Sequence, residues 1–309
     1  MSVTTTNIIM NSWRGSTQKQ YEPALKKWLS FCENSIDPFN PKIDQALDFL
    51  SQLYNEGASF HSMSNARSAL STFIKPFDST TFGRLPIVKR YMKGVFESRP
   101  TFPKSCITWD VNILFNYFRS LPDIENLSLK LLSLKLASLI AIASGGQRVQ
   151  TLQSLDINNI NYLPDKVIIP ITTKIKQTKP SKHIEPLELK GFPQEPKLCP
   201  VLHLKHYMTK VDEIRASDSL FVSYIKPHKA VSKDTISRWC KQMIANSGIN
   251  INLYTAHSNR SATTSKCNAS NIPLTEIMKK AGWSNARTFA KHYNKIIIDD
   301  VNLMQILTT

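Results

Sequence analysis

The sequence contains little glycine and cysteine, and each shortage excludes a class of protein. Nine glycines and 17 prolines in 309 residues are too few for a collagen-like chain or a long disordered tract. The cysteines are widely spaced, and no two of them form a Cys-x-x-Cys pair, which argues for a reducing compartment and against a zinc site. They are Cys32, Cys106, Cys199, Cys240 and Cys267. We therefore expect no metal and no cofactor.

Long apolar runs are also missing. The most apolar stretch, residues 127–143, is interrupted by Lys130 and Lys135, and it is too short and too charged to span a bilayer. The first 15 residues lack the basic start and the apolar block of a secretory signal. We expect neither a membrane span nor secretion.

Acidic residues are fewer than basic ones. Lys and Arg number 39 against 23 Asp and Glu, which gives a net charge of +16 and an isoelectric point near 9.6. Such a surplus attracts polyanions, either nucleic acid or an anionic membrane. A basic protein that stays soluble by self-repulsion is the alternative. The length exceeds one typical compact core and predicts two domains.

Apolar residues recur at helical spacing in the first 100 residues. The pattern predicts four short helices, which together make a small all-α domain over residues 1–98. The predicted helices cover residues 16–34 (capped by Ser16 or Thr17), 43–57 (closed by Gly57), 62–74 and 85–96. The last one carries a basic group, namely Arg84, Lys89, Arg90 and Lys93. Prolines and basic residues without apolar periodicity mark residues 99–106 as a linker.

The remaining part, residues 107–309, is predicted to be a second domain with a small sheet. Two β-branched or alternating runs, residues 166–172 and 184–189, flank a lysine-rich loop and indicate a β-hairpin. A further short strand is expected over residues 219–224. Helices are predicted over residues 109–121, 127–144, 148–154, 201–215 and 232–246, with several short ones after residue 256. The fold class is therefore mainly α with a small antiparallel sheet.

Five polar or aromatic residues of this second part are suited to phosphate chemistry. Arg148 follows a double glycine at the head of a helix, where a phosphate can approach the backbone. His257 and Arg260 stand three apart, on one helical face. Trp283 and Tyr293 follow in the segment AGWSNARTFAKHYNK. Taken singly, each has an ordinary explanation as a solvated helix end, a surface arginine or a packed aromatic.

Taken in order, these blocks resemble the tyrosine recombinase (phage integrase) family. The matching segments are SGGQRVQTLQSL, HSNRSATTS and AGWSNARTFAKHY, separated by the predicted hairpin. The residues of these and other segments, such as SWRGSTQKQYEPALKKWLSFC and MKGVFESRP, most resemble eukaryotic mobile-element recombinases of the DIRS, Ngaro and Crypton kind. The resemblance covers nearly the whole chain. It implies a helical core-binding (SAM-like) domain followed by a tyrosine recombinase catalytic domain.

The resemblance also implies a role for each residue. Tyr293 would attack a DNA phosphate and form a 3′-phosphotyrosyl bond, without ATP or metal. Arg148 and Arg260 would bind the non-bridging oxygens. His257 would contact the phosphate or move the tyrosine proton, and Trp283 would stand where relatives have a second histidine.

A hairpin lysine would donate the proton to the leaving 5′-oxygen. Lys176 is the choice, and Lys174 and Lys179 are the alternatives; the lysines without this role would contact the DNA backbone. The sequence departs from the family at Thr151, where many relatives have an acid that supports the site.

Double-stranded DNA is the expected partner, bound by Arg84, Lys89, Arg90 and Lys93 on one side and by the catalytic domain on the other. A homo-tetramer on paired DNA sites is implied, and the amphipathic residues 301–307 would either dock on a neighbouring protomer or pack on their own domain. The location would be the nucleus in a eukaryote and the cytoplasm otherwise.

Three other functions stay open at this point. The chain could be a DNA-binding descendant of a recombinase that no longer cuts, although six intact site residues favour activity. It could be a type IB topoisomerase-like enzyme, which shares the chemistry without exchanging strands between partners. It could also be an unrelated basic helical scaffold, which six ordered matches argue against.

Overall fold

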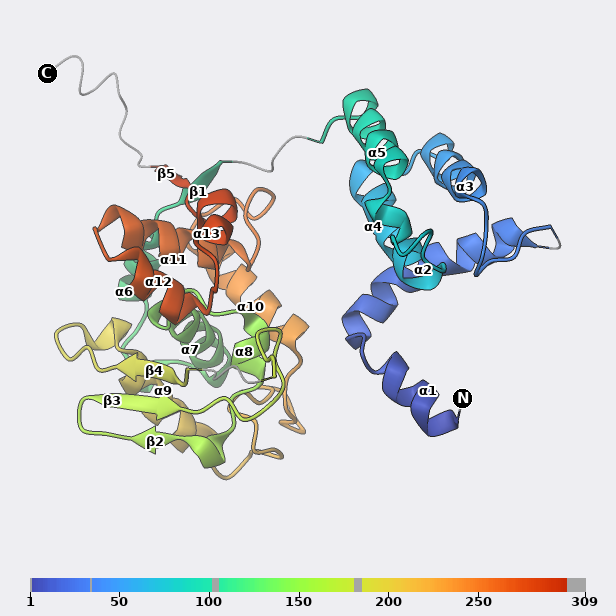
Figure 1. Cartoon of the computed structure of the whole chain (residues 1–309). Helices are drawn as coiled ribbons and strands as arrows, with labels where there is room; N and C mark the ends of the chain where they lie inside the picture. Colours follow the sequence, from blue (N-terminus) through green and yellow to red (C-terminus); the bar gives the residue numbers. More distant parts are fainter. Residues whose placement is uncertain (1, 34, 102–105, 181–184, 299–309) are drawn as a thin grey trace, which may run out of the picture. The chain divides into compact units, whose positions relative to one another are not determined.

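The chain forms two compact units, Met1–Lys104 and Ser105–Thr309. The computed structural model describes residues 2–33, 35–101, 106–180 and 185–298 (Figure 1). The amphipathic segment 301–307 lies outside these residues. No described helix is both long enough and apolar enough to cross a membrane.

The described residues of the first unit form helices and no strand. They are α1 (Val3–Met10), α2 (Gly15–Cys32), α3 (Ile43–Asn55), α4 (Phe60–Phe73) and α5 (Pro86–Ser98), with a 3-10 turn at Phe82–Arg84. Trp28, Phe49, Leu50, Met63 and Phe82 are fully buried in its core. Buried side chains recur every three or four residues along α3 (Ala46, Phe49, Leu50 and Leu53) and α5 (Val88, Met92 and Val95), which confirms the helical periodicity seen in the sequence.

Three details of this unit differ from the prediction. Helix α1 was not expected, because VTTTNIIM lacks a clear apolar stripe; its first turn is capped by the Ser2 hydroxyl, which accepts from Thr5 N–H at 3.1 Å. Helix α2 begins at Gly15, so Ser16 and Thr17 lie inside the first turn and are not the cap. Arg84 belongs to the 3-10 turn and not to α5.

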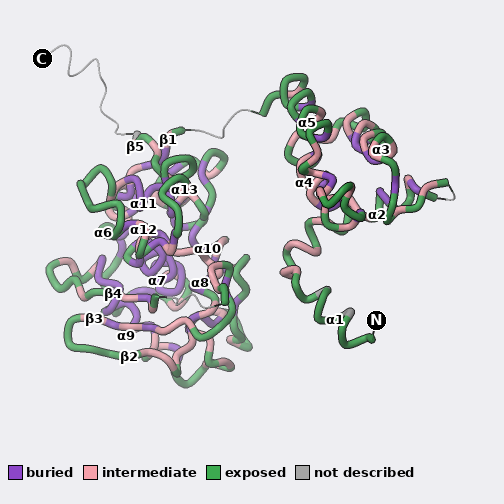
Figure 2. The backbone as a smooth tube through the Cα atoms, viewed as in Figure 1, coloured by how far each residue is buried: buried purple, intermediate pink, exposed green. Residues whose placement is uncertain are grey.

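The second unit is built around a buried helix, α7 (Leu129–Ala143), which lies within the apolar stretch of residues 127–143 (Figure 2). The other helices are α6 (Val111–Ser120), α8 (Val149–Gln153), α9 (Pro200–Val211), α10 (Lys233–Asn246), α11 (Ser258–Ala269), α12 (Leu274–Ala281) and α13 (Ala286–His292). The Ser232 hydroxyl caps α10 as predicted, accepting from Thr235 N–H at 3.2 Å. Helices α9 and α10 pack along α7 and close the core.

Two small sheets complete the unit. Strands β2 (Asn161–Tyr162), β3 (Lys166–Ile169) and β4 (Leu187–Lys190) form an antiparallel sheet, and β3 and β4 are the predicted hairpin. Strand β1 (Ile107–Trp109) pairs in parallel with β5 (Ile296–Ile298), a pairing that the sequence analysis did not anticipate. The mainly α class with a small antiparallel sheet is confirmed.

Two local predictions in this unit were wrong. Residues 107–109 are a strand and the helix starts only at Val111, because the Asp110 carboxylate accepts from Asn112 N–H at 2.9 Å and caps it. Residues 219–224 form two isolated bridges, Ser219 with Asp156 and Val222 with Ala230, and no strand. The apolar residues there fill the core without a continuous partner strand.

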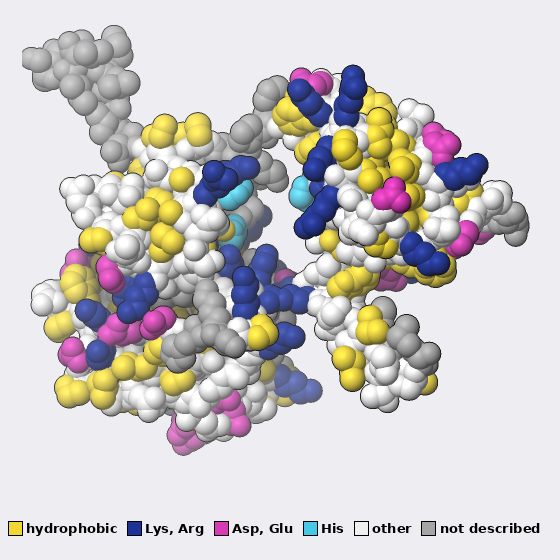
Figure 3. All heavy atoms as spheres, in the orientation of Figure 1, with side chains coloured by type: hydrophobic (Ala, Val, Ile, Leu, Met, Phe, Trp, Pro, Cys, Tyr) yellow, Lys and Arg dark blue, Asp and Glu magenta, His cyan; other side chains and the backbone are white. Residues whose placement is uncertain are grey.

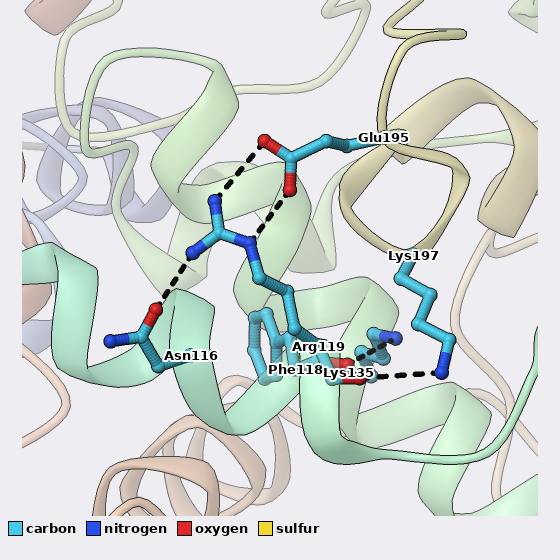
Figure 4. Close-up of polar contacts among 6 residues, drawn as sticks. All are labelled: Asn116, Phe118, Arg119, Lys135, Glu195 and Lys197. Atoms are coloured by element: carbon cyan, nitrogen blue, oxygen red, sulfur yellow. Dashed lines mark hydrogen bonds and ion pairs between the residues drawn. The ribbon is translucent and has the colours of Figure 1, made fainter.

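A buried lysine lies beside the end of α6. Lys135 on α7 is fully buried, and its Nζ donates to the Phe118 carbonyl at 3.3 Å. Lys197 donates to the neighbouring Arg119 carbonyl at 3.3 Å (Figure 4). Both ammonium groups thus satisfy carbonyls at the C-terminal end of a helix. Burial lowers the pKa of Lys135 to about 8, and the charge of Lys197 contributes.

This burial predicts a stabilising substitution. The unfolded chain keeps the ordinary lysine pKa, so the cost of charged Lys135 is fully present below about pH 8 and disappears as the pH rises towards 10.5. Lys135→Met is expected to raise the free energy of unfolding by about 1–2 kcal/mol at pH 7. The gain should shrink between pH 8 and 10. Urea unfolding measures both effects, with Lys130→Met, an exposed lysine on the same helix, as control. A loss of stability in Lys135→Met at pH 7 would contradict the assignment.

Candidate active site

Helix α11 places two of the predicted residues, His257 and Arg260, beside Tyr293. His257 is the N-cap residue and Arg260 lies in the first turn. The His257 Nε2 and Tyr293 Oη atoms are hydrogen-bonded at 3.1 Å. The Arg260 guanidinium carbon lies 5.3 Å from the centre of the Tyr293 ring. The two side chains therefore converge on the same phenol, as their spacing of three predicts.

Arg260 is nearly inaccessible, with 1% of its surface exposed. Its Nη1 donates to the Gly146 carbonyl at 2.7 Å and its Nη2 donates to the Ala281 carbonyl at 2.5 Å. Burial and the nearby positive charge of Arg148 lower the pKa of Arg260 to about 10, while Tyr293 has the opposite effect. The guanidinium thus stays charged at neutral pH, and two of its five donors are used.

Trp283 reaches the site from the turn that ends α12. Gly282 adopts the left-handed conformation (φ +68°), and Trp283 N–H returns to the Met278 carbonyl at 2.9 Å, which closes a Schellman turn. The indole ring stacks at 4.6 Å between centroids on Tyr293 and at 4.4 Å from the Arg260 guanidinium. The buried indole N–H has no hydrogen-bond partner within the described residues.

Tyr293 is the C-cap residue of α13, whose start is capped by Asn285. Its backbone carbonyl accepts from the Ser265 hydroxyl at 2.7 Å, and Lys295 N–H donates to the same Ser265 oxygen at 3.0 Å. The segment then enters β5, where Ile296 N–H donates to the Cys106 carbonyl at 3.0 Å. The short segment that carries the Tyr293 phenol is therefore fixed by hydrogen bonds to its backbone.

Arg148 follows the turn after α7 and is the N-cap residue of α8. Gly145 and Gly146 both have positive φ, and a Cβ on Gly146 would lie 2.9 Å from Arg260 Cα. The glycines are thus needed for two reasons: they let the chain turn sharply after α7, and they let the turn pack closely against α11. The side chain of Arg148 is half-buried, and its charge acts on both Arg260 and His257.

The lysine-rich loop between β3 and β4 reaches the same place. Lys176 N–H donates to Gln150 Oε1 of α8 at 3.2 Å, and Gln177 Nε2 donates to the Ala281 carbonyl at 3.1 Å. These bonds hold the loop at Lys176 and at the residue that follows it. Lys174 and Lys179 are exposed on the same loop.

His257 has its pKa lowered by its surroundings. Although the residue as a whole is exposed, packing around the imidazole is the main cause, and four positive charges lower the pKa further. They are Arg260, Arg148, Lys176 and Lys295. Of the three candidate hairpin lysines, Lys176 is thus the one that acts electrostatically on His257. A neutral imidazole at pH 7 can accept the proton of Tyr293.

The structure therefore brings together all six predicted catalytic residues. Thr151, at the position where many relatives have an acid, is buried in α8 and supplies no charge. The basic group Arg84, Lys89, Arg90 and Lys93 is exposed in the first unit, where Lys and Arg side chains gather over α4 and α5 (Figure 3). No three His, Cys, Asp or Glu side chains gather as metal ligands within the described ranges.

Sequence reasoning missed several contributors to the site. Lys295, whose charge lowers the pKa of His257, lies only two residues after Tyr293. That closeness in the sequence could have indicated that it belongs to the site. Gln150 and Gln177 hold the loop, and Ser265 binds the backbone of the Tyr293 segment; none of these polar contacts is visible in a motif.

A cavity of about 460 Å³ lies next to this cluster, between the sheet and α12. Gln177, Gly282 and Trp283 are in its wall, whereas Arg148, His257, Arg260 and Tyr293 are not. His257 is exposed and Arg148 and Tyr293 are half-buried, so these three side chains can be reached from outside this cavity, whereas Arg260 is buried beneath them.

Solved structures show that this fold is that of DNA recombinases. The Tn1549 transposon integrase in complex with transposon right end DNA matches with a TM-score of 0.61 and 11% identity, over 96% of this chain and 95% of that one. XerH site-specific recombinase bound to difH substrate, in a post-cleavage complex, matches at 0.58 and 16%, over 94% and 78%. A lambda integrase dimer bound to a COC′ core site matches at 0.54 and 17%, over 96% and 93%. At these identities the likeness shows the fold.

The family follows from the sequence profile. The profile of the phage integrase family matches residues 119–297, which include all six clustered residues. The chain therefore belongs to the phage integrase family, the tyrosine recombinases. A search of curated proteins gives no match.

The electrostatics of the site predict a titration. Removing a neighbouring positive charge makes protonation of the imidazole easier, so Arg148→Gln should raise the pKa of His257. Lys176→Gln should act in the same direction, whereas Lys174→Gln should leave this pKa unchanged. NMR titration of the histidine ring protons measures it, with His257→Gln to assign the resonance. An unchanged pKa in Arg148→Gln would contradict the geometry.

Proposed function

We propose that this protein cleaves and rejoins DNA strands as a site-specific recombinase. The observation that carries the proposal is the hydrogen bond of 3.1 Å between Tyr293 Oη and His257 Nε2, set among arginine and lysine charges. A phenol beside a neutral imidazole can lose its proton, and a positive surface binds the phosphodiester on which it acts.

The proposed reaction needs no external energy. Tyr293 Oη attacks the phosphorus, its proton passes to His257, and the bond to the 5′-oxygen breaks as the 3′-phosphotyrosyl bond forms. Lys176 Nζ gives the leaving 5′-oxygen its proton. Rejoining is the reverse, with a 5′-hydroxyl as the attacking group. Because the covalent bond conserves the energy of the phosphodiester, ATP is not consumed.

Three donors stabilise the charge on the phosphate. Arg148 and Arg260 supply guanidinium N–H groups to the non-bridging oxygens, and Arg260 retains donors beyond the two bound to carbonyls. The unpartnered indole N–H of Trp283 supplies the third. Since Tyr293 and His257 of one chain already meet, each protomer uses its own tyrosine.

Assembly and origin are part of the same proposal. The neighbours include a lambda integrase tetramer bound to a Holliday junction (TM-score 0.52), and we propose a tetramer on paired double-stranded DNA sites. The first unit serves as the core-binding domain, since its exposed basic group, in the 3-10 turn before α5 and on α5 itself, fits a DNA backbone. The resemblance of the sequence motifs supports an origin in a eukaryotic mobile element of the DIRS, Ngaro or Crypton kind. Such an origin would place the protein in the nucleus.

A DNA-binding descendant that no longer cuts is the second candidate. The six clustered residues argue against it, since a silent descendant has no need to keep a phenol in contact with a histidine. The following experiment decides between the two.

Cleavage can be tested on nicked suicide duplexes that carry sequences selected by this protein from a random DNA pool. Without magnesium or ATP, the wild type should form a covalent adduct on a denaturing gel, and Tyr293→Phe should form none. Lys176→Ala should slow adduct formation by about 10²–10⁴-fold, as expected for loss of a general acid. Lys174→Ala and Lys179→Ala remove the same charge from the same loop and should change the rate only a few-fold.

Either of two outcomes would change this account. No adduct on DNA that is bound in a gel shift would favour the non-cutting descendant. A larger loss in Lys174→Ala or Lys179→Ala than in Lys176→Ala would transfer the role of general acid to that lysine.

The first unit should contribute to DNA affinity through charge. Binding of duplex DNA should weaken as salt rises, and the combined Lys89→Ala, Arg90→Ala, Lys93→Ala variant should lower the slope of log K against log salt by about 0.9 for each phosphate that is no longer neutralised. Lys26→Ala is the control, because Lys26 is exposed in the same unit but paired with Glu22 at 2.7 Å. Equal slopes for the wild type and the triple variant would remove α5 from the DNA interface.

A further inference from the structure

A buried hydroxyl on α11 binds the backbone of the segment that carries Tyr293. Ser265 lies on α11 with 3% of its surface exposed. Its Oγ donates to the Tyr293 carbonyl at 2.7 Å and accepts from Lys295 N–H at 3.0 Å. One side chain thus binds the peptide groups on both sides of Asn294, the residue that follows Tyr293.

Within this segment, Asn294 N–H donates to the Phe289 carbonyl at 2.9 Å and Asn294 Oδ1 accepts from Asn268 Nδ2 at 3.3 Å, but neither bond involves the Tyr293 carbonyl. Tyr293 ends α13, so its carbonyl lies beyond the helical hydrogen bonds and needs an outside donor. Strand pairing begins only at Ile296, through the bond to the Cys106 carbonyl. Ser265 therefore fills the gap between the end of the helix and the start of the strand.

The same helix also carries the partners of the phenol. His257 caps α11 and Arg260 lies in its first turn, five residues before Ser265. A helix advances about 1.5 Å per residue, so these groups stand at fixed distances from Ser265. Any shift of the segment away from Ser265 would change the 3.1 Å contact between Tyr293 Oη and His257 Nε2.

We propose that Ser265 is a positioning residue that sets the phenol of Tyr293 for attack. It touches neither the phosphate nor the phenol, and it acts through the backbone of residues 293–295. The proposal rests on the proposed cleavage function. Near-attack geometry is sensitive to small displacements, so loss of this tether lowers the rate of chemistry rather than the affinity for DNA.

The test compares Ser265→Ala with Ser265→Thr, which keeps the hydroxyl, and with Ser261→Ala as matched control. Ser261 is also a buried serine of α11, but its hydroxyl donates to the Ser258 carbonyl of its own helix at 3.0 Å and lies 3.5 Å from Thr108 Oγ1, so it does not bind the backbone of residues 293–295. We expect Ser265→Ala to slow adduct formation at saturating suicide duplex by about 10–100-fold, with unchanged DNA affinity in a gel shift. Ser265→Thr should recover most of the rate, and Ser261→Ala should react like the wild type.

A second measurement needs no activity. Hydrogen–deuterium exchange of the full chain should show faster exchange in the peptide over residues 293–298 of Ser265→Ala, and unchanged exchange in α7 and α10. Faster exchange throughout would indicate general unfolding and would overturn the local role. Exchange equal to that of the wild type would do the same.

The two measurements separate this inference from the proposed function. If the wild type forms no adduct, cleavage is refuted, while exchange still decides whether Ser265 holds the segment. If the wild type cleaves and Ser265→Ala cleaves as fast, the positioning role is refuted and cleavage stands. Slower cleavage without recovery in Ser265→Thr would also count against the role of the hydroxyl.

Discussion

The site depends on the hydrogen bonds between the buried guanidinium of Arg260 and two backbone carbonyls. Removing a cation from water is costly unless hydrogen bonds replace the lost solvation. Here the Gly146 carbonyl, at the turn after α7, and the Ala281 carbonyl, at the end of α12, accept from it, and the Trp283 ring covers one face. Two segments far apart in the sequence, the turn after α7 and the end of α12, must therefore meet around one charged group on α11, which leaves little freedom in how the site is assembled.

That constraint explains the glycines at the site. Gly146 brings its carbonyl to Arg260 so closely that a side chain would meet the α11 backbone, and a side chain on Gly282 would meet Gln177 of the lysine-rich loop. The Ala281 carbonyl accepts from both Arg260 and Gln177. The end of α12 thus joins the arginine to the loop that carries Lys176.

The accumulated positive charge has two effects that favour the same chemistry. It attracts a phosphodiester, and it lowers the pKa of His257, so the imidazole stays neutral beside the phenol of Tyr293. A carboxylate at Thr151 would partly cancel this charge. Arg260 itself is bound by hydrogen bonds to two backbone carbonyls.

Much of this arrangement can be predicted from the sequence, because local patterns encode it. Ser232 indicates the start of its helix, and the β-branched run of residues 166–169 predicts the hairpin. The order of Arg148, Arg260 and Tyr293 indicates the family. The β1–β5 pairing could not be predicted, since it joins three-residue strands from opposite ends of the unit, and the apolar pattern at Trp109 equally suits a helix. The contacts of Ser265 and Gln177 were also hidden, because a hydroxyl or an amide carries no sign of its tertiary partner.

The most direct test of the account is the identity of the residue that becomes linked to DNA. The adduct formed on a suicide duplex can be digested with protease and nuclease, and the nucleotide-bearing peptide sequenced by mass spectrometry. The account predicts a single modified residue, Tyr293, with the nucleotide attached through its 3′-phosphate. Attachment at another residue, or through a 5′-phosphate, would contradict it.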